Sequence, residues 1–178
     1  RKGILAGFLL RGDGKNATRR SVQICHFVKT IKEWKEDETF CNGVLLLCVD
    51  GSIFPKEILT ATLNSEINPQ KKSLEEITIH NELFNMEKGE AFKQIYDMTF
   101  PEDFSLENDY RFDITPLSLA DANCYVFAVS NGIQVRVLAA QLTYIKDLSR
   151  HMLKNIDIHE AFISTREIEE MAKALKVD

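Results

Sequence analysis

Residues 124–140, CYVFAVSNGIQVRVLAA, contain two strand-forming runs around a tight-turn dipeptide. The runs, Cys124 to Val129 and Ile133 to Ala139, are rich in β-branched and aromatic residues, which favour strands. Between them lies Asn131-Gly132, a pair that readily adopts the positive φ angles of hairpin turns. This combination predicts an antiparallel β-hairpin.

More strand signals lie upstream. Residues 21–31, SVQICHFVKTI, alternate two sets of side chains along a β-branched run, which predicts a strand. In CNGVLLLCVDGSIFPKE (41–57), Asn42-Gly43 and Asp50-Gly51 bracket six apolar residues, 44–49. Both dipeptides favour hairpin turns, and a continuous apolar run is typical of a strand covered on both faces. We therefore expect a meander with a strand ending near Cys41, a central strand over 44–49 and an exit strand over 52–54 that Pro55 ends.

The other segments are assigned from their periodicity and end signals. Ser164 is followed three residues later by Glu167, the capping-box pattern that begins a helix. Apolar residues at helical spacing also predict helices over 89–98 and 142–156. We further expect a loop over 63–72, a strand or a short helix over 74–83, and a short strand over 110–114.

Together these segments predict an α+β fold with a mostly antiparallel β-sheet, made of the meander and the hairpins, and with helices mainly in the C-terminal half. The chain has 178 residues, enough to bury one continuous core. We therefore expect a single domain over 1–178, with a basic N-terminal segment (1–20), a sheet-rich body (21–141) and a helical tail (142–178).

Charge is distributed unevenly along the chain. Residues 1–35 hold nine Lys and Arg against two Asp and Glu, whereas residues 36–178 hold thirteen against twenty-five. An acidic body repels phosphate backbones and attracts basic proteins, so we expect a protein partner and no nucleic acid. An acidic surface kept for solubility explains the same counts equally well.

The apolar run near the N-terminus is interrupted by Arg11 and Asp13, and no run reaches the length of a membrane span. The four cysteines form no CxxC pair, which is typical of free thiols in a reducing compartment. We therefore expect a cytoplasmic protein with no membrane partner.

The residues that could support catalysis or metal binding show no signature spacing. No two of the four histidines lie three or four residues apart, and the cysteines do not follow a zinc pattern. Cys48 and Cys124 fall in predicted buried strands, where a thiol is usually inert. We therefore expect no catalytic residue, no metal, no cofactor and no small-molecule substrate.

The segment DMTFPEDFSLENDYRFD, residues 97–113, holds six acidic residues, four aromatic residues and one Arg. Acids around exposed rings suit the capture of a basic protein, because the charges steer the partner and the rings are buried at the contact. Two other interpretations remain: the carboxylates form a solvated face or a catalytic pair, or the rings anchor the loop to the core. The candidate partner-binding residues are Glu102, Asp103, Phe104, Glu107, Asp109 and Tyr110.

The order of several turn and core residues resembles the Immunity protein 42 family, within the immunity proteins of bacterial polymorphic-toxin and contact-dependent inhibition systems. The resemblance covers roughly residues 20–142. It rests on Trp34, on Phe40 with Asn42-Gly43, on Asp50-Gly51 with Pro55, on Asp113-Ile114, and on Asp121 ahead of the hairpin.

This resemblance implies a cytoplasmic protein that is not an enzyme and that binds the C-terminal toxin domain of a cognate effector. Binding would block the active site of the toxin or its access to substrate. Many such toxins are nucleases with a basic groove, which an acidic loop can occupy. On the residues alone, two alternatives stay open: a small cytosolic enzyme that uses a Cys or paired carboxylates, and a non-catalytic subunit of a larger complex.

Overall fold

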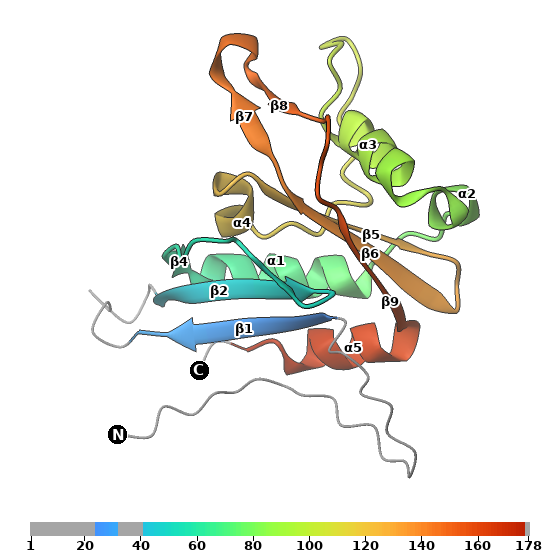
Figure 1. Cartoon of the computed structure of the whole chain (residues 1–178). Helices are drawn as coiled ribbons and strands as arrows, with labels where there is room; N and C mark the ends of the chain where they lie inside the picture. Colours follow the sequence, from blue (N-terminus) through green and yellow to red (C-terminus); the bar gives the residue numbers. More distant parts are fainter. Residues whose placement is uncertain (1–23, 32–40, 177–178) are drawn as a thin grey trace.

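The computed structural model describes residues 24–31 and 41–176, and Figure 1 shows how their helices and strands are arranged. The strands form antiparallel sheets and the helices pack against them, which confirms the α+β prediction. The helices are spread along the chain from α1 (Leu63–Glu75) to α5 (Thr165–Ala174). The expectation that they lie mainly in the C-terminal half is therefore wrong.

The first sheet is built around β2 (Asn42–Val49), which pairs with the other three strands of that sheet. Asp50 and Gly51 have φ angles of 48° and 77° and form the predicted turn after β2. Asn42-Gly43 lies inside β2 instead of in a turn. A Cβ atom on Gly43 would lie 2.2 Å from the carbonyl oxygen of Lys29, so this glycine permits the close approach of two strands. The partners of β2 are β1 (Ile24–Thr30), β3 (Ser52–Phe54) and β4 (Ala61–Thr62).

Burial along β2 alternates. Leu45, Leu47 and Val49 are buried, whereas the residues between them are only partly buried. The strand is thus fully covered on one face, and the expected coverage of both faces is wrong. The strand expected to end near Cys41 falls on residues outside the described ranges.

The second sheet has the order β5 (Cys124–Ser130), β6 (Gln134–Gln141) and β9 (His159–Ser164). The predicted hairpin is confirmed, and the side-chain oxygen of Asn131 accepts hydrogen bonds from the backbone nitrogens of Ile133 and Gln134 at its turn.

Two isolated β-bridges form along the outer edge of β5. Ile79 pairs with Ser130, and Asp113 pairs with Phe127. The short strand expected over 110–114 is reduced to the second bridge. The segment 74–83, expected to be a strand or a short helix, holds the end of α1, the bridge at Ile79 and the start of the short helix α2 (Asn81–Asn85).

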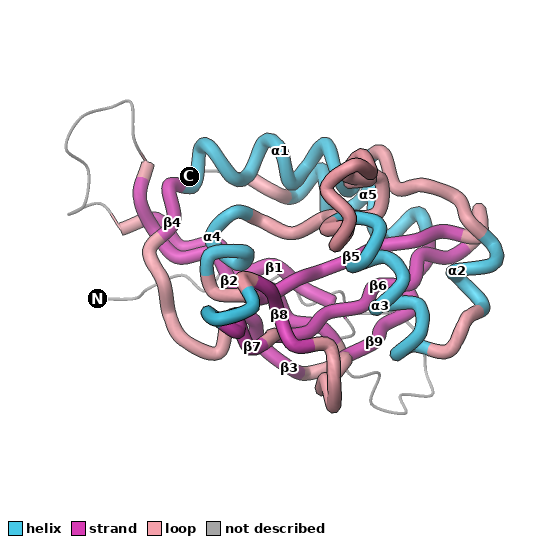
Figure 2. Tube along the Cα trace, turned by 90° about the horizontal axis from the view of Figure 1, so that it is seen from above, coloured by secondary structure: helices cyan, strands magenta, loops and turns pink. Residues whose placement is uncertain are grey.

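The second sheet separates two apolar cores, because successive residues of β5 point to opposite faces. Val126 packs with residues of β2, α1 and α5, whereas Phe127 packs with residues of α2 and of α3 (Lys88–Thr99). Figure 2 shows α3 lying over β5 and β6. The helix predicted over 89–98 is confirmed as α3, and the helix predicted from Ser164 is confirmed as α5 with its capping box.

Helix α1 occupies the segment expected to be a loop, so that prediction is wrong. Its buried positions have helical spacing, but two of them are polar, and this hid the apolar periodicity. The carboxylate of Glu66 accepts hydrogen bonds from the backbone nitrogen and the hydroxyl of Ser118, and Gln70 lies within hydrogen-bonding distance of His26. The buried residues of α1 are Leu63, Glu66, Ile67, Gln70 and Leu74.

The helix expected over 142–156 is also wrong, because this segment forms a β-hairpin. Its strands are β7 (Thr143–Ile145) and β8 (Arg150–Met152), and a short 3₁₀ turn, η2 (Lys146–Leu148), joins them. Leu142 and Leu153 pack into the second core at the two ends of the hairpin. The apolar residues that suggested a helix therefore anchor the base of a projecting ribbon.

Candidate partner-binding surface

The predicted site residues lie between α3 and α4 (Leu117–Asp121), and residues 101–110, here called the acidic loop, project from one end of the molecule (Figure 1). Hydrogen bonds close the base of this loop. The backbone nitrogen of Asp109 donates to the carbonyl oxygen of Met98 at 2.9 Å, and the side-chain amide of Asn108 donates to that of Thr99 at 2.8 Å. The acidic loop is therefore tied to the last turn of α3.

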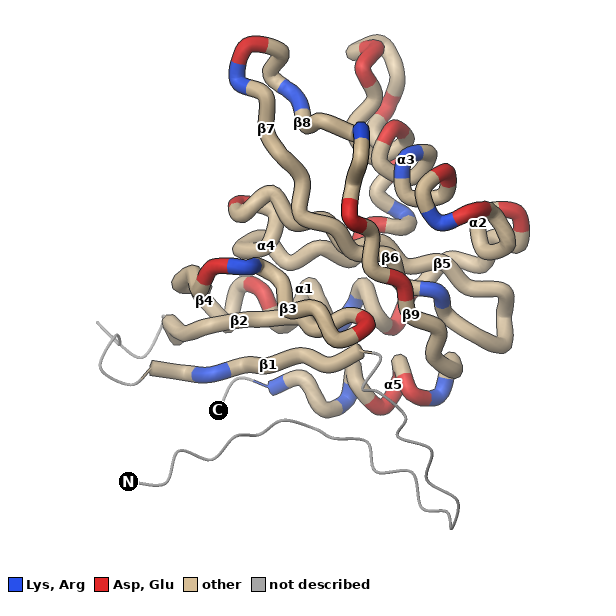
Figure 3. The backbone as a smooth tube through the Cα atoms, in the orientation of Figure 1, with Lys and Arg blue, Asp and Glu red and all other residues tan. Residues whose placement is uncertain are grey.

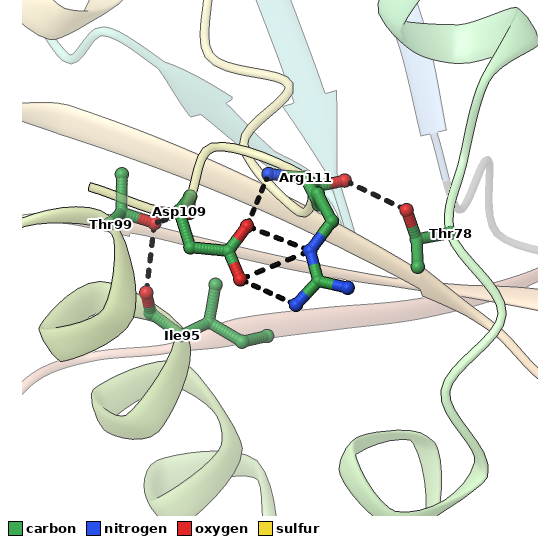
Figure 4. Close-up of polar contacts among 5 residues, drawn as sticks. All are labelled: Thr78, Ile95, Thr99, Asp109 and Arg111. Carbon is green, nitrogen blue, oxygen red and sulfur yellow. Dashed lines mark hydrogen bonds and ion pairs between the residues drawn. The ribbon is translucent and has the colours of Figure 1, made fainter. Parts of the chain in front are cut away.

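Figure 4 shows how Asp109 strengthens this base. Its carboxylate accepts hydrogen bonds from Nε of Arg111 at 2.9 Å and from Nη2 at 2.6 Å, while the Arg111 carbonyl oxygen accepts one from Thr78. The hydroxyl of Thr99 donates to the carbonyl oxygens of Ile95 and Asp109. The hydrogen bond from Arg111 lowers the pKa of Asp109, so this carboxylate is charged at neutral pH and fixes the shape of the loop.

The aromatic residues of segment 97–113 divide into two groups. Phe112 is fully buried in the second core, and Phe100 packs against Tyr96 and Tyr125. Phe104, at the tip of the acidic loop, is 100% exposed, and Tyr110 is 57% exposed. Anchoring to the core thus explains the first two rings but leaves Phe104 available to a partner.

The exposed carboxylates of the acidic loop are held in defined positions. Asp103 accepts hydrogen bonds from the backbone nitrogen of Ser105 at 2.9 Å and from its hydroxyl at 2.7 Å, and these bonds lower the pKa of Asp103. Glu102 forms an ion pair with Arg150 of β8. The structure therefore brings the loop carboxylates together on one protruding segment.

A groove of about 570 Å³ lies between α3 and the acidic loop. Two of the predicted site residues, Glu107 and Asp109, line the loop side of this groove, whereas none of the residues on its helix side was predicted. The missed signal is a set of polar residues at helical spacing, opposite the residues of α3 that enter the core. Burial raises the pKa of Asp97, and the charges of Lys93 and Arg150 oppose that shift. The lining residues are Glu90, Lys93, Gln94, Asp97, Met98, Pro101, Leu106, Glu107 and Asp109.

The hairpin β7–β8 projects from the same end of the molecule as the acidic loop (Figure 1). Figure 3 shows acidic residues along the loop, and both acidic and basic residues on α3 and on the hairpin. The ion pair between Glu102 and Arg150 links the two. Sequence reasoning missed the hairpin because it assigned a helix there, although Thr143, Tyr144 and Ile145 are residue types that favour strands.

Two of the four cysteines, Cys25 and Cys124, are not activated nucleophiles. Burial raises the pKa of Cys124 to about 11, and burial together with the neighbouring Cys48 raises the pKa of Cys25 to about 11. Both thiols therefore stay protonated at neutral pH. In the part of the chain that the structure describes, no group of three or more His, Cys, Asp or Glu residues could hold a metal ion.

One arrangement that sequence reasoning did not foresee brings Ser52, His159 and Asp157 together. The Ser52 hydroxyl lies 3.1 Å from Nε2 of His159, and a carboxylate oxygen of Asp157 lies 3.2 Å from the same nitrogen. A catalytic triad needs the carboxylate on the opposite ring nitrogen, where it orients the imidazole. These three residues therefore do not form a serine nucleophile site.

A projecting, tethered loop with exposed acids and an exposed ring is the candidate surface for binding another protein. The chain belongs to the Immunity protein 42 family, whose model matches residues 24–177. Its structure is similar to that of CdiI from Burkholderia dolosa AUO158, with a TM-score of 0.66 and 15% identity over 85% of this chain and 92% of that chain. At this level of identity the similarity shows a shared fold. No curated protein matches the chain.

Family membership confirms the resemblance drawn from the sequence, and it identifies a non-catalytic immunity protein. The family match extends beyond the expected 20–142 and includes the β7–β8 hairpin, β9 and α5. Among residues 24–31 and 41–176, no helix combines the length and the apolar character needed to cross a membrane.

Proposed function

We propose that this protein binds the toxin domain of a cognate effector in the cytoplasm and neutralises it by covering a basic active-site or substrate groove with the acidic loop. Membership of an immunity protein family supports a toxin partner. The choice of surface rests on one observation: the acidic loop is closed at its base and presents a fully exposed Phe104 among exposed carboxylates.

The physical chemistry of the acidic loop suits this role. A nuclease groove is basic because it binds phosphates, so carboxylates on a protruding loop gain favourable electrostatic interactions there. The hydrogen bonds to Asp103 and Asp109 hold these charges in place before binding, which reduces the conformational entropy lost in the complex. Phe104 then supplies apolar area at the contact.

The test is growth of a bacterial host that expresses the cognate toxin domain, with and without this protein. We expect growth to be restored only when the protein is present, and we expect the two chains to purify together as a stable complex. Restored growth without a complex would contradict neutralisation by direct binding. A toxin that remains active in the presence of this protein would contradict the proposed function itself.

A further inference from the structure

The hairpin formed by β7 and β8 is a two-stranded sheet that joins neither of the larger sheets. An isolated ribbon of this kind is marginal in water and needs support from the rest of the protein. Most of its residues are exposed, including Leu148 at 57% and Met152 at 41%. The fold therefore maintains a projecting element whose large apolar residues contribute little to either core.

Side chains hold this ribbon in place. His151 of β8 lies 2.7 Å from the hydroxyl of Tyr96 in α3 and 2.8 Å from the side-chain oxygen of Asn123. The ring of His151 also meets the ring of Tyr125 edge-on, with the centroids 5.1 Å apart. These contacts come from α3 and from residues 123–125 at the start of β5, so the orientation of the hairpin is fixed.

One face of the hairpin is turned toward the acidic loop. Side chains two positions apart in a strand share a face, so Arg150 and Met152 lie on the same side of β8. Arg150 pairs with Glu102, which places that face next to the acidic loop. Met152 and the exposed rings and acids of the loop therefore belong to one continuous end of the molecule.

We infer that this end, with Leu148 and Met152 of the hairpin beside the acidic loop, forms a composite docking surface for the toxin domain. The inference rests on the proposed function and adds a second contact element to it. The partner is a protein that presents apolar side chains next to a basic groove. Apolar anchors at the centre of a protein interface supply most of its affinity, while the surrounding charges supply orientation.

The charges argue against a second copy of this chain as the occupant. Residues 101–110 hold four acids and no Lys or Arg, and hairpin residues 143–152 hold Lys146, Arg150 and Asp147, so this end carries a net charge of −3 that a second copy would share. Like charges facing each other across an interface oppose association. A basic partner removes this conflict, because it is attracted by the same carboxylates.

The test compares two double variants of the full chain for affinity to the purified toxin domain. In L148S/M152S we expect affinity to fall about tenfold or more, because two apolar anchors are lost. The matched control I58S/I133S changes two residues that are each 76% exposed and lie outside the docking surface. We expect its affinity to stay within about twofold of the wild type, and we expect both variants to keep the wild-type unfolding temperature, because exposed side chains contribute little to stability.

The outcomes separate this inference from the proposed function. Unchanged affinity of L148S/M152S, in a complex that is weakened when the loop carboxylates are reversed to Lys, overturns the composite surface and leaves the proposed function standing. A wild-type protein that forms a dimer, which L148S/M152S converts to a monomer, assigns the hairpin to self-association and also overturns the inference. Failure of the wild-type protein to bind the toxin domain overturns both.

Discussion

The hydroxyl of Tyr96 and Nδ1 of His151 lie 2.7 Å apart, and this hydrogen bond joins α3 to β8. The other ring nitrogen, Nε2, lies 2.8 Å from the side-chain oxygen of Asn123, which can only accept a hydrogen bond. The proton therefore sits on Nε2, and Nδ1 accepts from Tyr96. Burial lowers the pKa of His151, so the neutral imidazole that this arrangement requires is the form present at neutral pH.

Removing the Tyr96 hydroxyl should loosen the hairpin. In Y96F, Nδ1 of His151 loses its donor, and we expect a loss of about 1 kcal/mol in the free energy of unfolding. Amide hydrogen exchange over residues 143–152 should become faster than in the wild type, because the local support of β8 is weakened. Y110F is the matched control, since Tyr110 is exposed. Unchanged exchange over 143–152 in Y96F would contradict the role assigned to this hydrogen bond.

Arg136 is the buried cation of the second sheet, with 3% of its side chain exposed. It binds Glu160 of β9 at 2.6 Å and donates from Nη1 to three backbone carbonyl oxygens around the end of α2. In R136M these oxygens and the Glu160 carboxylate lose their partner. We expect urea denaturation to report a loss of about 3–5 kcal/mol. R166M, which removes an exposed helical ion pair, should cost at most about 0.5 kcal/mol. Equal losses in the two variants would contradict this account.

His26 predicts a specific pH dependence of stability. Burial lowers the pKa of His26 from 6.5 to about 4, so between these values the unfolded chain binds the proton more readily than the folded chain. The stability that the folded protein has with this ring neutral is fully present above pH 6.5 and is lost as the pH falls toward 4. By pH 5 we expect a loss on the order of 1–2 kcal/mol in the free energy of unfolding.

The variant H26Q isolates this contribution, because it removes the titrating group and keeps a side chain that can hydrogen-bond Gln70. Urea denaturation from pH 8 to pH 5 gives the free energy of unfolding of wild type and H26Q. As the pH falls, the wild type should lose more of this free energy than H26Q does. A difference that stays constant over this range would show that His26 does not titrate as expected.

Cys124 should react slowly in the native protein. With a pKa of about 11, its thiolate is about a thousandth or less of the population at pH 7.5, and its side chain is fully buried. We expect a thiol reagent at this pH to modify Cys124 at least about a hundredfold more slowly than the same cysteine in urea. Mass spectrometry assigns the modified residue. Rapid labelling of native Cys124 would revive the alternative of a cysteine nucleophile.

The parts of the fold that the sequence predicted are those in which local preference and tertiary structure agree. The hairpin around Asn131-Gly132 and the capping box of α5 are local signals, and the core places both segments accordingly. Asp50-Gly51 forms its turn, but Asn42-Gly43 does not. A glycine at position 43 is compatible both with a turn and with the close packing of two strands. Only the tertiary structure shows that close packing is the reason for it here.

The missed elements have physical causes of the same kind. Helix α1 carries Glu66 and Gln70 on its buried face, where Ser118 and His26 satisfy them across large sequence distances. The β7–β8 hairpin resembles a helix in sequence because Leu142 and Leu153 are core residues at its base. The acidic half of the candidate surface followed from composition, whereas its apolar half depended on this unforeseen hairpin.

The most direct test of the central claim is the affinity of the purified chain for the toxin domain, measured by calorimetry, before and after the charge reversal E102K/D103K/E107K. The matched control, E75K/E76K/E169K, reverses three exposed acids away from the loop. Glu75 ends α1, Glu76 follows it and Glu169 lies on α5. We predict that the loop variant binds about tenfold or more weakly, whereas the control stays within about twofold. Unchanged affinity of the loop variant would contradict the claim that the acidic loop contacts the toxin.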